Sequence, residues 1–97
     1  MKYKFDYSKE KNLILKVTRG ISFDDVIDAV EQGRELDNFK HLNRRKYPNQ
    51  RVLVVEINNY AYAVPYVVDE KKGMAFLKTI YPSSRHTKKY LGRKQKI

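Results

Sequence analysis

The sequence predicts an α+β fold with the element order β-α-α-β-β-β-α, in which an antiparallel sheet carries helices packed on one face. Apolar residues recur at helical spacing in two N-terminal stretches, and β-branched and aromatic residues dominate three later stretches joined by short turns. A capped basic helix follows them. Strands linked by short turns pair antiparallel, and helices then cover the sheet. The 97 residues suit a single domain, 1–97.

The N-terminal stretch predicts a strand followed by a helix. Residues 2–7 alternate aromatic with charged side chains, which is typical of a half-buried strand. Ser8 is a favourable N-cap residue, and Gly20 is a favourable residue just after a helix. The helix between them carries three apolar side chains at helical spacing, Leu13, Ile14 and Val17.

A second helix is predicted between Ser22 and Gly33. Ser22 and Asp25 have the spacing of a capping box, in which each side chain binds the backbone N–H of the other residue. Ile21 and Val26 have the spacing of a hydrophobic staple. The expected buried stripe consists of Phe23, Val26, Ile27 and Val30.

The middle of the chain predicts a loop and then three strands. Residues 34–50 show no clear period, so we expect a surface loop there. Strands are expected at 51–57, 60–68 and 74–81, the first two joined by a tight Asn58-Asn59 turn. Pro65 lacks a backbone donor, which predicts that the second of these strands lies near an edge or is bulged.

The C-terminal stretch predicts a basic helix. Pro82 ends the last strand, and Ser83 or Ser84 caps a helix over 84–91. The basic tail 92–97 is expected to be flexible. On the helix, one face is expected to carry Thr87, Tyr90 and Leu91.

Charge is distributed very unevenly along the chain. The formal net charge is +10, and from Lys71 onward there are nine Lys or Arg and no acidic residue. Such a charge favours a polyanionic partner, first nucleic acid and second an anionic membrane surface, and the alternative is a solubilising tail. The absence of Cys excludes disulfides and thiolate chemistry. No signal peptide or apolar membrane span is evident, so we expect a cytoplasmic protein.

Two basic clusters each contain one of the two histidines. His41 lies beside Arg44, Arg45 and Lys46, and His86 lies in the final helix. Two imidazoles suffice for general acid–base cleavage of RNA, with cations stabilising the phosphate in the transition state. We therefore expect a catalytic group of His41, His86, Arg85 and Tyr81, and RNA contacts from Arg44, Arg45, Lys46, Lys78, Lys88 and Lys89.

Metal and nucleotide sites have little support in the sequence. The acidic residues are scattered, and no His, Asp or Glu spacing resembles a metal site. Glycine-rich phosphate loops are absent as well. We therefore expect no metal and no cofactor.

The ordered set of short motifs resembles the BrnT-type toxins of bacterial type II toxin–antitoxin systems. The opening "KFDYSKEKN" matches the family at Phe5, Asp6, Lys9 and Asn12, and "RGISFDDV" matches it from Gly20 to Asp25. The ending "KTIYPSSRHTKKYL" matches a final strand that runs into a basic helix. Two positions depart from the family: Arg19 replaces a frequent His, and Ser84 stands where an Arg is common.

The resemblance implies a RelE-like ribonuclease fold, metal-independent mRNA cleavage that inhibits translation, and a cognate antitoxin that is itself DNA-binding. It also implies that polar side chains line a wall of the site, where this chain has Lys9, Lys11 and Arg19. The expected function is therefore a ribonuclease toxin, acting on mRNA either free or on the ribosome. The alternative is a non-catalytic basic module that binds RNA or a protein partner.

Overall fold

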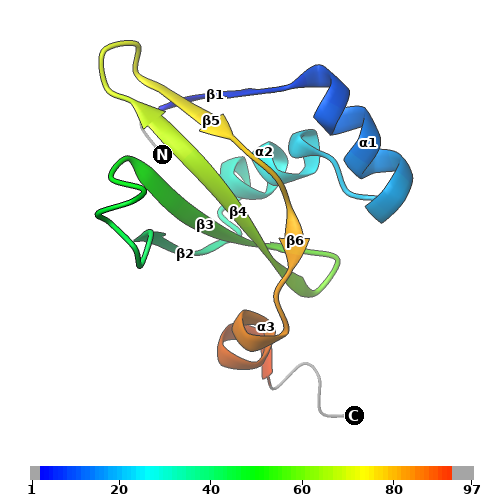
Figure 1. Cartoon of the computed structure of the whole chain (residues 1–97). Coiled ribbons are helices and arrows are strands. Elements are labelled where there is room, and N and C mark those ends of the chain that lie inside the picture. Colours follow the sequence, from blue (N-terminus) through cyan, green and yellow to red (C-terminus); the bar gives the residue numbers. More distant parts are fainter. Residues whose placement is uncertain (1–2, 93–97) are drawn as a thin grey trace.

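The computed structural model describes residues 3–92. Along the chain, the elements follow one another as shown in Figure 1. They are β1 (Lys4–Tyr7), α1 (Lys9–Arg19), α2 (Phe23–Glu31), β2 (Glu35–Lys40), β3 (Gln50–Ile57), β4 (Tyr60–Asp69), β5 (Met74–Leu77), β6 (Tyr81–Pro82) and α3 (Ser84–Leu91).

The strands form one mixed sheet in the order β1-β5-β4-β3-β2, and β6 pairs with β4 beyond the end of β5. The α+β class is confirmed. The expectation of a purely antiparallel sheet is wrong for one pair, because β1 runs parallel to β5. These two strands are far apart in the chain, and such a connection permits parallel pairing at the edge of a sheet.

The stretch expected as one long loop contains the edge strand β2. Its two central residues are polar, and each has a partner elsewhere in the fold: Asp37 binds Tyr90 and Asn38 binds Tyr66. Such partners satisfy polar groups within a strand but leave no periodic pattern in the sequence. The loop itself is therefore limited to residues 41–49.

Of the two alternatives for Pro65, the edge position is wrong, because β4 lies between β3 and β5. An irregular pairing is present there, because Tyr66 pairs with Leu77 whereas Ala63 pairs with Tyr81, which leaves one extra residue opposite this part of β4. The Pro65 carbonyl accepts a hydrogen bond from the backbone N–H of Lys78 at 2.8 Å. A strand residue directs its backbone N and O to the same side. The Pro65 nitrogen, which has no hydrogen to donate, therefore faces residues 78–80, which lie between β5 and β6. The predicted strand 74–81 is accordingly two short strands.

Two apolar clusters lie on opposite faces of the sheet. The larger one joins Leu15 of α1 and Phe23 of α2 to alternate residues of β3, β4 and β5. The smaller one consists of Val52, Val54, Ala61 and Ala63, with Leu36 and Phe39 packed against it.

Helix α3 covers the second face of the sheet, so the expectation that all helices pack on one face is wrong. The backbone N–H of Ser83 donates to the Ala61 carbonyl at 2.9 Å, and the Thr87 hydroxyl accepts from the Ala61 N–H at 2.9 Å. These bonds attach α3 to the start of β4, at the opposite end of that strand from the turn into β5 (Figure 1).

The predicted helix starts and the predicted hairpin are confirmed. Ser8, Ser22 and Ser83 are N-caps, and Ser22 with Asp25 forms the capping box. Asn58 and Asn59 have φ angles of 54° and 63°, as a tight hairpin turn requires. Of the tail predicted to be flexible, only Gly92 falls within the described residues.

The apolar side chains of α1 lie mainly outside the core. Leu15 is buried, whereas Leu13, Ile14 and Val17 are exposed. Among residues 3–92, no helix is long and apolar enough to cross a membrane.

Candidate functional site

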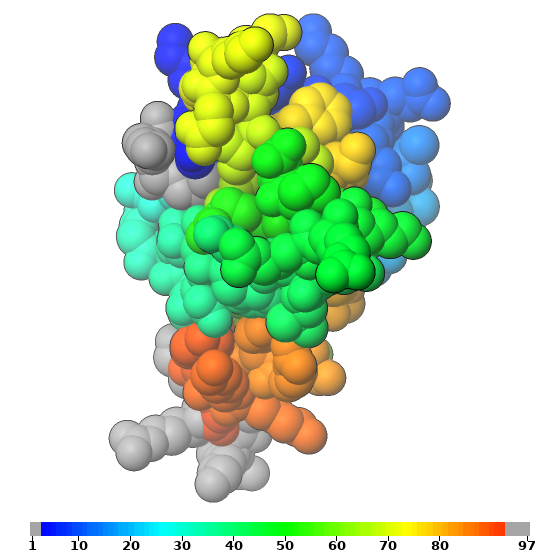
Figure 2. Space-filling model, turned by 60° about the vertical axis from the view of Figure 1, so that its left-hand side comes forward, coloured from blue at the N-terminus to red at the C-terminus, as the bar shows by residue number. Residues whose placement is uncertain are grey.

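A cleft of about 340 Å³ lies on the α3 face of the sheet. It is bordered by the end of β2, the loop that follows it, β6 and the first turn of α3. In Figure 2 this loop, in green, lies above α3, in orange. The lining residues are Phe39, His41, Leu42, Val52, Ala63, Tyr81, Ser83, Arg85 and His86. All four residues expected to form the catalytic group therefore line one cleft.

His86 is held by packing and by one short hydrogen bond. Its ring stacks between Phe39, with centroids 5.8 Å apart, and Tyr90, at 6.3 Å. Its Nδ1 lies 2.6 Å from the hydroxyl oxygen of Ser83, the N-cap residue of α3. Burial, and then the positive charge of Arg85, lower the pKa of His86 below its ordinary value, so the ring is neutral at pH 7.

A hydrogen bond between Tyr90 and Asp37 fixes the position of the Tyr90 ring that stacks on His86. The Tyr90 hydroxyl donates to Asp37 Oδ2 at 2.6 Å, which joins α3 to β2. This hydrogen bond lowers the pKa of Asp37, with help from the backbone N–H of Asn38, and it raises the pKa of Tyr90. Because Asp37 stays ionised, the contact is a charge-assisted hydrogen bond, which is stronger than a neutral one.

His41 is oriented by its own loop. Its Nδ1 accepts the backbone N–H of Asn43 at 3.0 Å, and its ring packs against Tyr47 with centroids 4.6 Å apart. A nitrogen that accepts a hydrogen bond carries no proton, so neutral His41 has its proton on Nε2. This ring is therefore arranged as a hydrogen-bond donor through Nε2.

Tyr81 and Arg85 are the exposed members of the group. Tyr81 lies on β6, paired with Ala63, and 41% of its surface is exposed. Arg85 lies in the first turn of α3 and is exposed. Both side chains are therefore accessible to a large substrate.

Most of the predicted RNA contacts lie on the two elements that border the cleft. The three loop cations Arg44, Arg45 and Lys46 are exposed, as are Lys88 and Lys89 on α3. Lys46 lies over the Tyr47 ring at 5.4 Å and Lys89 over the Tyr90 ring at 5.2 Å, each measured from Nζ to the ring centroid.

Lys78, Lys9 and Arg19 lie further away. Lys78 follows β5, and its backbone N–H binds Pro65, whose partner in β3 is Val52 of the cleft. Lys9 and Arg19 are at the two ends of α1, on the opposite face of the sheet. The structure does not bring these two residues to the cleft.

Two residues of the site were missed by the sequence reasoning as functional residues. Phe39, which stacks on His86, falls in the stretch that was expected to be a loop. The sequence therefore did not indicate that Phe39 lies on a strand and faces the cleft. Ser83 was expected only as a cap, although a Ser three residues before a His on a helix start is a detectable spacing. Within the described part of the chain, no group of three or more His, Cys, Asp or Glu is placed to hold a metal ion.

The fold and the cleft define an α+β protein with a basic, histidine-containing site. Comparison with known proteins finds no match to this chain among family models, curated proteins or solved structures.

Proposed function

We propose that the protein is a metal-independent endoribonuclease. The observation that carries the proposal is the convergence of His41, Tyr81, Arg85 and His86 on one cleft bordered by exposed cations. Phosphate groups of RNA are attracted to such a surface, and the cleft supplies the side chains that phosphodiester cleavage needs.

His86 is the proposed general base. When its Nδ1–H donates to the Ser83 hydroxyl, the lone pair on Nε2 is free to accept the proton of an RNA 2′-hydroxyl. The 2′-oxygen then forms a bond to phosphorus while the bond from phosphorus to the 5′-oxygen breaks. The low pKa of His86 keeps this base unprotonated at neutral pH.

Tyr81 is the proposed general acid, and it delivers its phenolic proton to the departing 5′-oxygen. Arg85 and the Nε2–H of His41 bind the phosphate oxygens and stabilise the charge that develops on them. Assigning His41 to hydrogen bonding rather than to acid catalysis follows from its Nδ1, which is occupied by the Asn43 N–H.

The biological setting that we propose is a type II toxin–antitoxin module of RelE-like toxins. The protein would be cytoplasmic, cleave mRNA and so inhibit translation, and a cognate DNA-binding antitoxin would neutralise it. The resemblance of the sequence to BrnT-type toxins supports this setting, as does the concentration of charge around the cleft.

The proposal is tested by inducing the protein in a bacterial host and mapping transcript ends by primer extension. We expect growth arrest and new, discrete 5′ ends. The purified protein should cleave RNA in EDTA and leave 2′,3′-cyclic phosphate and 5′-hydroxyl termini. The matched control is the double variant His41→Asn/His86→Asn, and intact transcripts with the wild-type protein would contradict the proposal.

The pH dependence of cleavage offers a separate prediction. The rate should rise with pH and level off, with a midpoint below 6.5, because protonated His86 cannot act as a base. Arg85→Gln removes a positive charge that disfavours protonation, so the midpoint should move upward. It should stay below 6.5, because burial is the larger cause. Lys88→Gln should leave the midpoint unchanged, and a midpoint indifferent to Arg85→Gln would argue against His86 as the base.

The second candidate is a non-catalytic module that binds RNA or a partner protein. One observation favours it: both imidazoles already have structural roles, since His86 stacks between two rings and His41 closes its loop. If the purified protein binds RNA but leaves it uncleaved, this candidate is favoured over the enzyme.

A further inference from the structure

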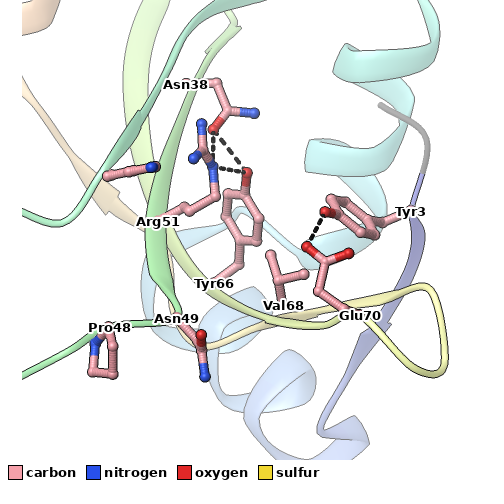
Figure 3. A pocket seen from close by; sticks show the side chains of 9 residues that line it. Tyr3, Asn38, Pro48, Asn49, Arg51, Tyr66, Val68 and Glu70 are labelled. Atoms are coloured by element: carbon pink, nitrogen blue, oxygen red, sulfur yellow. Dashed lines mark hydrogen bonds between the residues drawn. The ribbon is translucent and has the colours of Figure 1, made fainter. Parts of the chain in front are cut away.

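A second cavity, of about 360 Å³, lies on the opposite face of the sheet from the histidine cleft. Arg51, Tyr66 and Asn38 form one side of it, and Tyr3 and Glu70 form the other (Figure 3). Tyr66 belongs to the apolar cluster under α1 and α2, which places the cavity on that face. It shares no lining residue with the cleft.

Arg51 is held in place through one nitrogen only. Its Nε donates to Asn38 Oδ1 at 3.2 Å and to the Tyr66 hydroxyl at 3.1 Å, and that hydroxyl donates to Asn38 Oδ1 at 2.7 Å. Within residues 3–92, the two terminal nitrogens of the Arg51 guanidinium have no acceptor. The network therefore fixes the Arg51 side chain, while its two terminal nitrogens can still donate a pair of hydrogen bonds to an anion.

Further donors surround the same fork. Asn38 uses its Oδ1 as an acceptor, so its amide NH₂ remains to donate to a ligand. Lys40 also lines the cavity and adds a second positive charge. These groups project from β2 and β3, and several donors around one point suit the multiple oxygens of a phosphate better than the two of a carboxylate.

The other side of the cavity has a different chemistry. The Tyr3 hydroxyl donates to Glu70 at 2.7 Å, which raises the pKa of Tyr3 and fixes the carboxylate. Val68 and Pro48 add apolar surface. A ligand with a phosphate at one end and an apolar body bearing hydrogen-bond donors at the other would match both sides. The volume is in the range typical of small-ligand sites, about 300–1,000 Å³.

We propose that this cavity binds a phosphomonoester, of the nucleoside monophosphate class, through Arg51, Lys40 and Asn38. The phosphate accepts hydrogen bonds from the Arg51 fork, the Asn38 amide and the Lys40 ammonium group. Glu70 accepts from a donor on the body of the ligand, such as the exocyclic amine of a base. This site is independent of the proposed ribonuclease cleft.

The test is to titrate the full chain with AMP, inorganic phosphate and succinate in turn and to measure binding by isothermal titration calorimetry. The buffer is phosphate-free and of low ionic strength. We expect saturable binding that is tightest for AMP, weaker for inorganic phosphate and weakest for succinate. Equal binding of AMP and phosphate would support free phosphate as the ligand rather than a nucleotide.

Substitutions at two lining residues test whether AMP binds in this cavity. Arg51→Gln should weaken AMP binding by about tenfold to a hundredfold. Lys40→Gln should weaken it up to about fivefold, and because Lys40 is exposed this variant is a check should Arg51→Gln fold poorly. Lys16→Gln, which removes an exposed charge of α1 that does not line the cavity, should leave AMP binding unchanged.

Two results would overturn the inference. One is the absence of saturable binding of AMP and phosphate to the wild-type protein. The other is binding that neither Arg51→Gln nor Lys40→Gln weakens. RNA cleavage should stay unchanged in Lys40→Gln, so a failure of the ribonuclease proposal and a failure of this site give different patterns.

Discussion

His86→Ala is expected to lower the rate constant of RNA cleavage by about 10²–10⁴-fold, the usual contribution of a general base. The imidazole is buried, neutral at pH 7 and oriented by Ser83, so no neighbouring group can replace it at the same place. RNA affinity should change little, because the exposed cations proposed to bind phosphate remain. Single-turnover cleavage and fluorescence anisotropy with a labelled RNA measure the two effects separately.

The difficulty with His86→Ala is that it also removes a ring from the stack between Phe39 and Tyr90. His86→Asn is the matched control, because an amide nitrogen can still reach the Ser83 hydroxyl but cannot act as a base at neutral pH. Both variants should lose cleavage, whereas urea denaturation should show a smaller loss of stability for Asn than for Ala. Normal cleavage by the Asn variant would remove His86 from the mechanism.

The candidate site could be predicted largely because most of it is local in the chain. Tyr81 and Arg85 lie either side of the turn into α3, and His86 follows directly, so a strand that ends beside a capped helix brings them together. His41 was named because it is one of two histidines and lies in a basic cluster, and neither ground predicts that it lies near His86. Its arrival at the same cleft depends on β2, the strand that the sequence did not reveal.

What the sequence could not predict involves contacts between distant residues. Asp37 and Asn38 look like loop residues until Tyr90 and Tyr66 are known to bind them across 53 and 28 positions. The face covered by α3 is likewise set by the bonds from Ser83 and Thr87 to Ala61. Local signals, in contrast, were sufficient for the three N-caps and the Asn58-Asn59 turn, because the residues that form these features are close in sequence.

The largest loss of stability is expected for Phe23→Ala, at about 3–5 kcal/mol in the free energy of unfolding. The Phe23 side chain is fully buried, and its ring packs on Tyr7 with centroids 5.1 Å apart. Its backbone N–H donates to Asn12 Oδ1 at 2.7 Å, so this residue joins β1, α1 and α2. Deleting the ring leaves a cavity where three elements meet. Urea denaturation measures the loss.

Phe76→Ala is the matched control, because the same atoms are removed from a ring that is 37% exposed and lies on the other face of the sheet. Phe76→Ala should lower the free energy of unfolding by about 1 kcal/mol.

Cleavage by Phe23→Ala is a separate prediction. At temperatures where Phe23→Ala remains folded, it should still cleave RNA, because the cleft is formed on the α3 face, away from the space left by the deleted ring. A loss of cleavage in folded Phe23→Ala would mean that the helices α1 and α2 also shape the proposed active site. Equal losses of stability for the two variants would instead contradict a core centred on Phe23.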